Sequence, residues 1–413
     1  MSNKIIKDDI GKEIAGNIKL IADAITIGKR KIYGFRRNNT DSNPLTRIEY
    51  LNDANGFTPV TVNKSDGTFS YGSWFDFIND NIKPVMLYFD GEVAYELDRE
   101  DTTKKENGLA SDIDNSSFQG NAMVEFSNFK YVSRMSIGDY DYVYFSNEKV
   151  NETYVDYPFI DDNGIHRDAF YFGMFHGCAD SSNRMRSIAG MEILRSQTAA
   201  TEKTYCQANG LGHDMFSWSQ LNYIWDLLTM LGKTDNFQET FGQGICNYLW
   251  NDGNNPFGWT VGQTKDKGCF FGESAGQNCV RTLWIEDLWG RAWQRCQGLI
   301  NDYGTYKVKL HGPYPTPTDS SGTYSDYINT GLTTSAEGYV TKANCSKFGF
   351  LPLATGGGSN TFFCDYYYKN DNGCRFALVG APWSDGSLCG RYVNLDSSAS
   401  RSNVNIGSRL SKI

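Results

Sequence analysis

Histidine and cysteine side chains are the first candidates for catalysis in this chain. The four histidines are His166, His176, His213 and His311. His213 directly precedes Asp214, but a general base and the carboxylate that orients it must meet in space, and adjacency along the chain does not achieve this. No Gly-x-Ser-x-Gly motif, which would present a serine nucleophile, occurs in the sequence. We therefore expect the histidines to be structural.

The cysteines could form disulfides, bind zinc or act as nucleophiles. No Cys-x-x-Cys pair occurs, which disfavours a cysteine-based zinc site. The first 25 residues carry acids where a secretory signal would have an apolar run, so we expect the chain to fold in a cytosol. Thiols stay reduced there, and the sequence predicts free, mostly buried cysteines. The ten are Cys178, Cys206, Cys246, Cys269, Cys279, Cys296, Cys345, Cys364, Cys374 and Cys389.

Motifs for metals, phosphates and glycosides are incomplete. The triplet WND at 250–252 is similar to a calcium-binding element of sugar-binding lectins, but calcium needs six to eight oxygens and no EPN or QPD triplet supplies the others. The run TGGGSN at 355–360 precedes a strand-like segment and lacks the helix that favours phosphate. With 48 acidic residues, no glycosidase pair can be singled out. The sequence predicts no cofactor and leaves bound calcium undecided.

Composition favours strands and turns over helices. Aromatic residues make up 14% of the 413 residues, charged residues only 21%, and glycine occurs 42 times. The net charge of -9 argues against nucleic acid as a partner, because such surfaces need clustered Lys and Arg. No apolar stretch approaches the roughly 20 residues that span a bilayer, so membrane insertion is not expected.

The order of the elements suggests three regions. Isoleucines between residues 5 and 27 recur at helical spacing, and this stripe could dock against sibling copies or fold back on its own domain. Short strand-like runs follow, and the polar stretch 102–117 indicates a boundary. We thus expect a helix for attachment or oligomerisation at 1–30, a strand-rich region at 31–121 and a ligand-binding domain at 122–413.

The third region mixes strands and helices. Residues 122–160 read as two or three strands, and apolar spacing predicts helices at 217–233, with a cap at Ser217 or Ser219, and at 281–302. From residue 361 the chain returns to strands, with turns at Asn372-Gly373 and Asp385-Gly386, and a terminal antiparallel sheet is predicted. The predicted fold class is α+β, with antiparallel strands and two helices.

The segment between Trp383 and Ile406 is mostly small and polar, although strand-like sequences enclose it. Loops held by a rigid scaffold often carry binding residues, and mixed polar side chains beside rigid aromatics are typical of antibody paratopes. An ordinary solvent-facing loop is the alternative. The predicted ligand-binding residues are Trp383, Asp385, Ser387, Leu388, Arg391, Tyr392, Val393, Asp396, Ser398, Arg401 and Val404.

Three stretches resemble the C-type lectin fold of the formylglycine-generating-enzyme type, and especially the variable proteins of diversity-generating retroelements. IEDLWGRAWQRC (285–296) is similar to the family's segment around GNVWEW, ALVGAPW (377–383) to its LRGGSW strand, and NIGSRL (405–410) to its closing NIGFRL strand. The order of the predicted elements matches that of the family over residues 122–413, whereas the motifs are specific only in the last forty residues. Residues 1–121 lie outside the resemblance. Segment 383–406 would be the diversified part.

The resemblance implies a non-enzymatic phage tail-fibre protein that determines host tropism. Its partners would be a bacterial cell-surface protein or glycan and other phage tail proteins, and it would act in the virion as a homotrimer after folding in the host cytoplasm. A bacterial variable ligand-binding protein and an enzyme of the formylglycine-generating type, or a fibre-borne glycosidase, are the alternatives. The oxidases of this family place a catalytic cysteine two residues after the strand tryptophan, where this chain has Asp385, and Cys389 lies only near the second cysteine position.

Overall fold

The computed structural model describes residues 30–249, 258–333 and 335–413. Strands form three large sheets and three small ones, so the predicted α+β class is confirmed. None of the helices in these ranges has the length and apolar character to cross a membrane. The expected N-terminal helix lies outside the described residues. The helices described are α2 (Phe75–Asn81), α3 (Ala199–Gln207), α4 (Trp218–Gly232) and α5 (Phe237–Phe241), with 3₁₀ turns η1 (Tyr157–Phe159), η2 (Ser321–Tyr324) and η3 (Gly386–Leu388).

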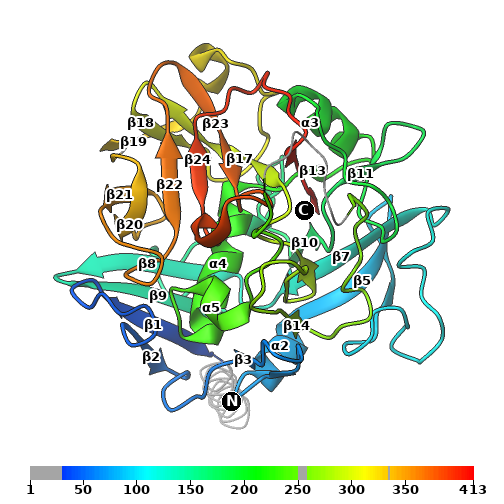
Figure 1. Ribbon diagram of the computed structural model, residues 1–413, viewed down its shortest axis with the longest axis horizontal. Coiled ribbons are helices and arrows are strands. Elements are labelled where there is room, and N and C mark those ends of the chain that lie inside the picture. The colour runs from blue at the N-terminus through cyan, green and yellow to red at the C-terminus, as the bar shows by residue number, and fades with distance from the viewer. Residues whose placement is uncertain (1–29, 250–257, 334) are drawn as a thin grey trace, which may run out of the picture.

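A four-stranded antiparallel sheet forms one side of the molecule, at the lower left of Figure 1. The strand-like runs that follow residue 30 form its first two strands, and a later hairpin completes it. Its order is β2 (Ile48–Asn52), β1 (Ile32–Asn38), β9 (Tyr140–Ser146) and β8 (Tyr131–Ile137).

A six-stranded sheet joins the two regions expected on either side of residue 121. That residue falls inside β7, and residues 120–126 of β7 pair with the whole of β5. The two segments therefore share one sheet and one core. The order is β13 (His213–Met215), β26 (Leu410–Lys412), β10 (Ala169–Gly173), β7 (Gly120–Ser127), β5 (Ile82–Tyr88) and β6 (Val93–Glu96).

The largest sheet holds the C-terminal segment, and it is mixed rather than antiparallel as predicted. β24 inserts between β22 and β23, antiparallel to β23 and parallel to β22. The turn at Asn372-Gly373 therefore does not close a tight hairpin. The order is β19 (Ile328–Thr333), β18 (Thr305–Val308), β17 (Trp293–Asp302), β23 (Cys374–Val379), β24 (Val393–Leu395), β22 (Tyr366–Lys369), β20 (Gly338–Ala343) and β21 (Pro352–Thr355), with β25 (Ile406–Gly407) parallel to β17.

Three small sheets complete the strands of the described ranges. They are β3 (Thr61–Val62) with β4 (Phe69–Ser70), β11 (Cys178–Ala179) with β12 (Met185–Arg186), and β14 (Phe270–Phe271) with β15 (Arg281–Thr282) and β16 (Ile285–Glu286).

Helix α4 confirms the first predicted helix and forms the centre of the core, between the large sheets (Figure 1). The Ser217 hydroxyl accepts the backbone N–H of Gln220 at 3.3 Å, while the Gln220 side chain accepts the N–H of Ser217 at 2.9 Å. This capping box satisfies two otherwise unpaired donors. The helix ends at Gly232, and Lys233 adopts the left-handed conformation. Nearly every residue of α4 is buried, as expected for a helix enclosed on all sides.

The second predicted helix, at 281–302, is wrong. Leu283, Trp284, Asp287 and Arg291 all have positive φ, which a right-handed helix cannot contain, and β17 follows. This strand lies between β18 and β23 and is buried on both faces except at its last residue. A strand covered on both faces has no polar–apolar alternation, so its apolar residues could be fitted to a helical stripe.

Candidate functional site

The C-terminal segment 383–406 contains a buried frame. Trp383 is fully buried and packs edge-on against Trp259, with ring centroids 5.2 Å apart. Tyr392 is 5% exposed and lies between the rings of Trp293 and Tyr366, at 4.7 and 5.4 Å. Val393 is fully buried in β24. Three of the predicted ligand contacts therefore hold the segment in place instead of meeting solvent.

Arg391 also belongs to this frame, because it is 2% exposed and sits in a buried network of charges. Its Nε donates to Oδ2 of Asp365 at 2.7 Å, and its Nη2 lies 3.1 Å from Oδ1 of Asp235. Asp235 is shared with Arg37 at 2.7 Å. Burial opposes ionisation of Asp235, but the surrounding arginines, with Arg47 among them, outweigh it and lower its pKa to about 2. The network ties segment 383–406 to β1 and to the end of α4.

Around η3 the backbone is fixed, the Ser387 side chain faces outward and Leu388 packs against the hydrophobic core. The backbone N–H of Gly386 donates to the carbonyl of Cys246 at 2.8 Å, and its carbonyl accepts from the Gln238 side chain at 3.1 Å. Ser387 is exposed, and its hydroxyl lies 2.9 Å from that of Tyr339. Leu388 is half-buried. Exposed side chains at η3 can therefore change without altering the backbone bonds that hold the turn.

Asp385 precedes η3 and is half-buried. Burial raises the pKa of its carboxyl to about 6, although a hydrogen bond from Ser384 opposes this shift. The carboxyl changes charge near neutral pH and is the titrating group on this part of the segment.

Residues 396–404 form a second group of outward side chains. Ser397 and Ala399 are buried, and their carbonyls accept from Phe376 at 2.7 Å and from Ala199 at 2.9 Å. Asp396 and Ser398, next to these buried residues, are half-buried, and Arg401 is exposed, with its Nη1 3.4 Å from Oδ2 of Asp396. Val404 is half-buried and packs against the hydrophobic core.

The two groups do not form one patch. The 385–388 group precedes β24 and the 396–404 group follows it, so they lie at opposite ends of this strand (Figure 1). Sequence reasoning treated the eleven residues as one surface. The structure places four in the frame, three at η3 and four beyond β24.

Sequence reasoning missed the tyrosines beside η3. Tyr339 from β20 and Tyr366 from β22 pack edge-on at 5.2 Å, and Tyr368 is 37% exposed. Tyrosine offers an apolar ring with a polar tip, which suits partly wet contacts. The run DYYY at 365–368 was the available signal, but it was interpreted only as a strand.

One cluster of metal-type ligands occurs among the described residues, and an arginine already fills it. Ligand atoms of Cys279, Glu286 and Asp287 lie within 4.8 Å of one another. Arg291 donates to Sγ of Cys279 and Oδ2 of Asp287, at 2.6 Å each. Glu286 accepts from the backbone N–H of Thr264 at 2.8 Å. The Arg291 guanidinium therefore supplies the positive charge that balances these ligands. Segment 285–296, which resembles the family's GNVWEW region, thus contributes to a buried ion cluster.

Nine of the ten cysteines and two of the histidines are buried. All ten cysteines are free, and all but Cys345 are buried, which confirms the prediction of free, mostly buried thiols. Burial raises the pKa of the Cys389 thiol well above its usual value and disfavours the reactive thiolate. Burial also lowers the pKa of His213 to about 4 and that of His176 well below its usual value, so both rings are neutral at pH 7.

No protein-family model and no curated protein matches this chain. Among solved structures it is similar to the Major Tropism Determinant U1 variant, with 10% identity and a TM-score of 0.30 over 80% of this chain and 72% of that chain. A match with a TM-score this low does not establish a shared fold or family.

Proposed function

We propose that this chain is a phage receptor-binding protein that attaches to a bacterial cell-surface protein or glycan through segment 383–406. The observation that carries the proposal is the division of this segment into a buried frame and outward side chains. Trp383, Arg391 and Tyr392 are fixed by rings and ion pairs, whereas Ser387 and Arg401 face solvent. Such a segment can vary its contacts without losing its backbone.

The resemblance of residues 377–410 to variable proteins supports the remainder of the proposal. According to this part of the proposal, the protein acts on the tail fibre as a homotrimer beside other tail proteins, and it performs no catalysis. Several copies on one virion would strengthen weak single contacts through avidity.

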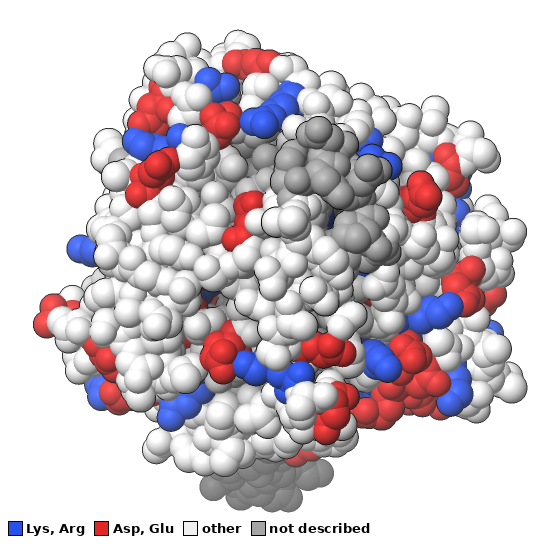
Figure 2. Space-filling view, in the orientation of Figure 1, with Lys and Arg blue, Asp and Glu red and all other residues white. Residues whose placement is uncertain are grey.

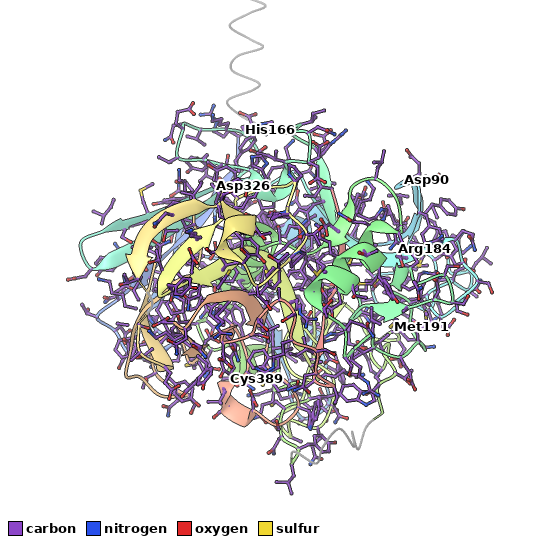
Figure 3. All side chains as sticks on the ribbon, turned by 90° about the horizontal axis from the view of Figure 1, so that it is seen from above. Asp90, His166, Arg184, Met191, Asp326 and Cys389 are labelled. Carbon is purple, nitrogen blue, oxygen red and sulfur yellow. The ribbon has the colours of Figure 1, made fainter. Side chains whose placement is uncertain are left out.

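A cell-binding assay tests the proposal at each end of β24. Fluorescently labelled protein is titrated against a panel of bacterial strains, and Ser387→Trp and Ser398→Trp are compared with the wild type on the strain that binds. The control is Ser181→Trp, at an exposed serine on the β11–β12 turn. Arg184, on the same turn, lies on a different flank of the molecule from Cys389, which adjoins η3 (Figure 3).

We expect at least one of the two segment variants to weaken cell binding by about tenfold or more, because a bulky ring at a packed contact removes its complementarity. The Ser181→Trp variant keeps wild-type binding. Unchanged binding by both segment variants, with all proteins folded, would contradict attachment through segment 383–406.

A further inference from the structure

A polar hollow opens beside η3, outside the segment that the sequence singled out. Its volume is about 160 Å³, well above the roughly 10–15 Å³ that one water molecule needs, so it has room for a small polar ligand. Short irregular pieces of chain surround it: the β3–β4 turn, the start of α5, the loops around residues 274 and 359, and η3. The hollow therefore depends on segments more than 300 residues apart.

Uncharged amides and hydroxyls make up most of the lining. They come from Asn236, Gln238, Gln243, Ser274, Ser359 and Ser387. Amides and hydroxyls both donate and accept hydrogen bonds, as sugar hydroxyls do. An apolar ligand would leave these groups unpaired, which is unfavourable.

The charges at the hollow cancel. Lys64 and Glu239 also line it, and Nζ of Lys64 lies 2.8 Å from Oε1 of Glu239. Figure 2 shows a mainly uncharged surface between η3 and α5, with a band of both positive and negative side chains across the lower part of the face. An anionic or cationic ligand would have to compete with the existing ion pair, whereas a neutral ligand would not.

Part of the lining already has partners, and part is available to a ligand. The Gln238 amide N–H₂ donates to the carbonyls of Gln243 and Gly386, at 3.2 and 3.1 Å, which fixes this side of the wall. Within the described part of the chain, the side chains of Gln243, Ser274 and Ser359 make no hydrogen bond to protein. These three groups come from three different loops and offer donors and acceptors around one small volume.

We infer that this hollow binds one neutral, polyhydroxylated sugar unit of a bacterial surface glycan, without a metal ion. This inference rests on the proposed receptor-binding function and names the ligand class for it. A peptide fits less well, because strand addition requires an exposed sheet edge and no strand lines the hollow. Ser387 lies on the rim, so a larger residue there narrows the hollow and changes which sugar fits.

Saturation-transfer NMR with free monosaccharides tests the inference directly. The probes are glucose, galactose, mannose, N-acetylglucosamine and N-acetylgalactosamine, with N-acetylneuraminic acid as a charged comparison. Ser359→Trp and Ser274→Trp fill the hollow at exposed positions, and Ser181→Trp is the matched control. Gln243→Ala removes one amide and keeps the volume open.

We expect at least one neutral sugar to give a transfer signal that Ser359→Trp and Ser274→Trp abolish, that Ser181→Trp preserves and that EDTA does not change. Gln243→Ala weakens binding about tenfold, because a hydrogen bond in the site is lost. No signal from any neutral sugar, an undiminished signal in the Ser359→Trp protein, or a stronger signal from N-acetylneuraminic acid would overturn the inference. Thermal unfolding of each variant confirms that it is folded.

The same proteins in the cell-binding assay separate this inference from the proposed function. Loss of cell binding in Ser359→Trp, together with competition by the free sugar, supports both. If neither Ser359→Trp nor any free sugar reduces cell binding, the sugar site is overturned but the receptor-binding function stands. The receptor would then be a protein. Wild-type protein that binds sugar but no cell supports the sugar site and contradicts the proposed function.

Discussion

Replacing Arg391 should destabilise the protein strongly, although this residue lies in the segment expected to vary. Arg391→Met keeps much of the side-chain volume but removes the charge that faces Asp365 at 2.7 Å and Asp235 at 3.1 Å. Asp235 keeps Arg37 at 2.7 Å, whereas no other ion pair to Asp365 is recorded within the described ranges. Removing one partner of a buried pair costs about 3–5 kcal/mol, and we expect a loss of this size in the free energy of unfolding.

Urea unfolding followed by tryptophan fluorescence measures the effect. The matched control is Arg401→Met in the same segment: this side chain is 47% exposed and lies 3.4 Å from Asp396, so we expect a loss below about 1 kcal/mol. Adding Asp365→Asn to Arg391→Met neutralises the unpaired carboxylate, so the double variant should be more stable than the sum of the single changes implies. Equal losses for Arg391→Met and Arg401→Met would refute the division into frame and outward side chains.

Three further predictions concern the frame, the carboxyl beside η3 and α4. Trp383→Ala and Ile406→Ala remove fully buried side chains and should each lower the free energy of unfolding by about 2–5 kcal/mol in urea titrations; changes below about 1 kcal/mol would contradict their burial. Because the folded pKa of Asp385, about 6, exceeds its unfolded value, its stabilising contribution is complete below pH of about 4 and is lost as pH rises through 6. Between these pH values the ionisation of Asp385 should lower the free energy of unfolding by about 1–3 kcal/mol, and Asp385→Asn should remove this pH dependence. An unchanged pH dependence in the variant would show that Asp385 does not cause it. Ser217→Ala breaks the capping box of α4 and should cost about 1 kcal/mol, measured by thermal unfolding against the exposed Ser181→Ala.

Local signals predicted the elements whose stability is local. The cap at Ser217, the apolar spacing after it and the glycine at its end place α4 within a residue of its observed bounds. The runs after residue 30 predicted β1 and β2, because their tight turns and β-rich composition act over a few residues. The free thiols were predicted from the expected folding in a cytosol and from the spacing of the cysteines.

The predictions of secondary structure and strand order failed where pairing with segments distant in sequence decides the structure. β17 had the spacing of a helix, but strands on both sides bury it, and that pairing is not encoded within the segment itself. β24 inserts between two strands that precede it in the chain, which no turn signal indicates. The shared sheet across residue 121 arises in the same way, from the pairing of β5 with β7.

The candidate site shows most clearly the difference between what local sequence determines and what distant segments determine. The sequence by itself determined that segment 383–406 is small and polar between strand-like flanks, because composition belongs to the segment alone. Only the tertiary structure decided that Arg391 is buried against Asp235, which is 156 positions away, while Arg401 faces solvent. It also decided that Ser387 borders a hollow built from four other pieces of chain. The physical reason is that exposure and ion pairing depend on which distant segments cover a residue, and chemically identical side chains a few residues apart are covered differently.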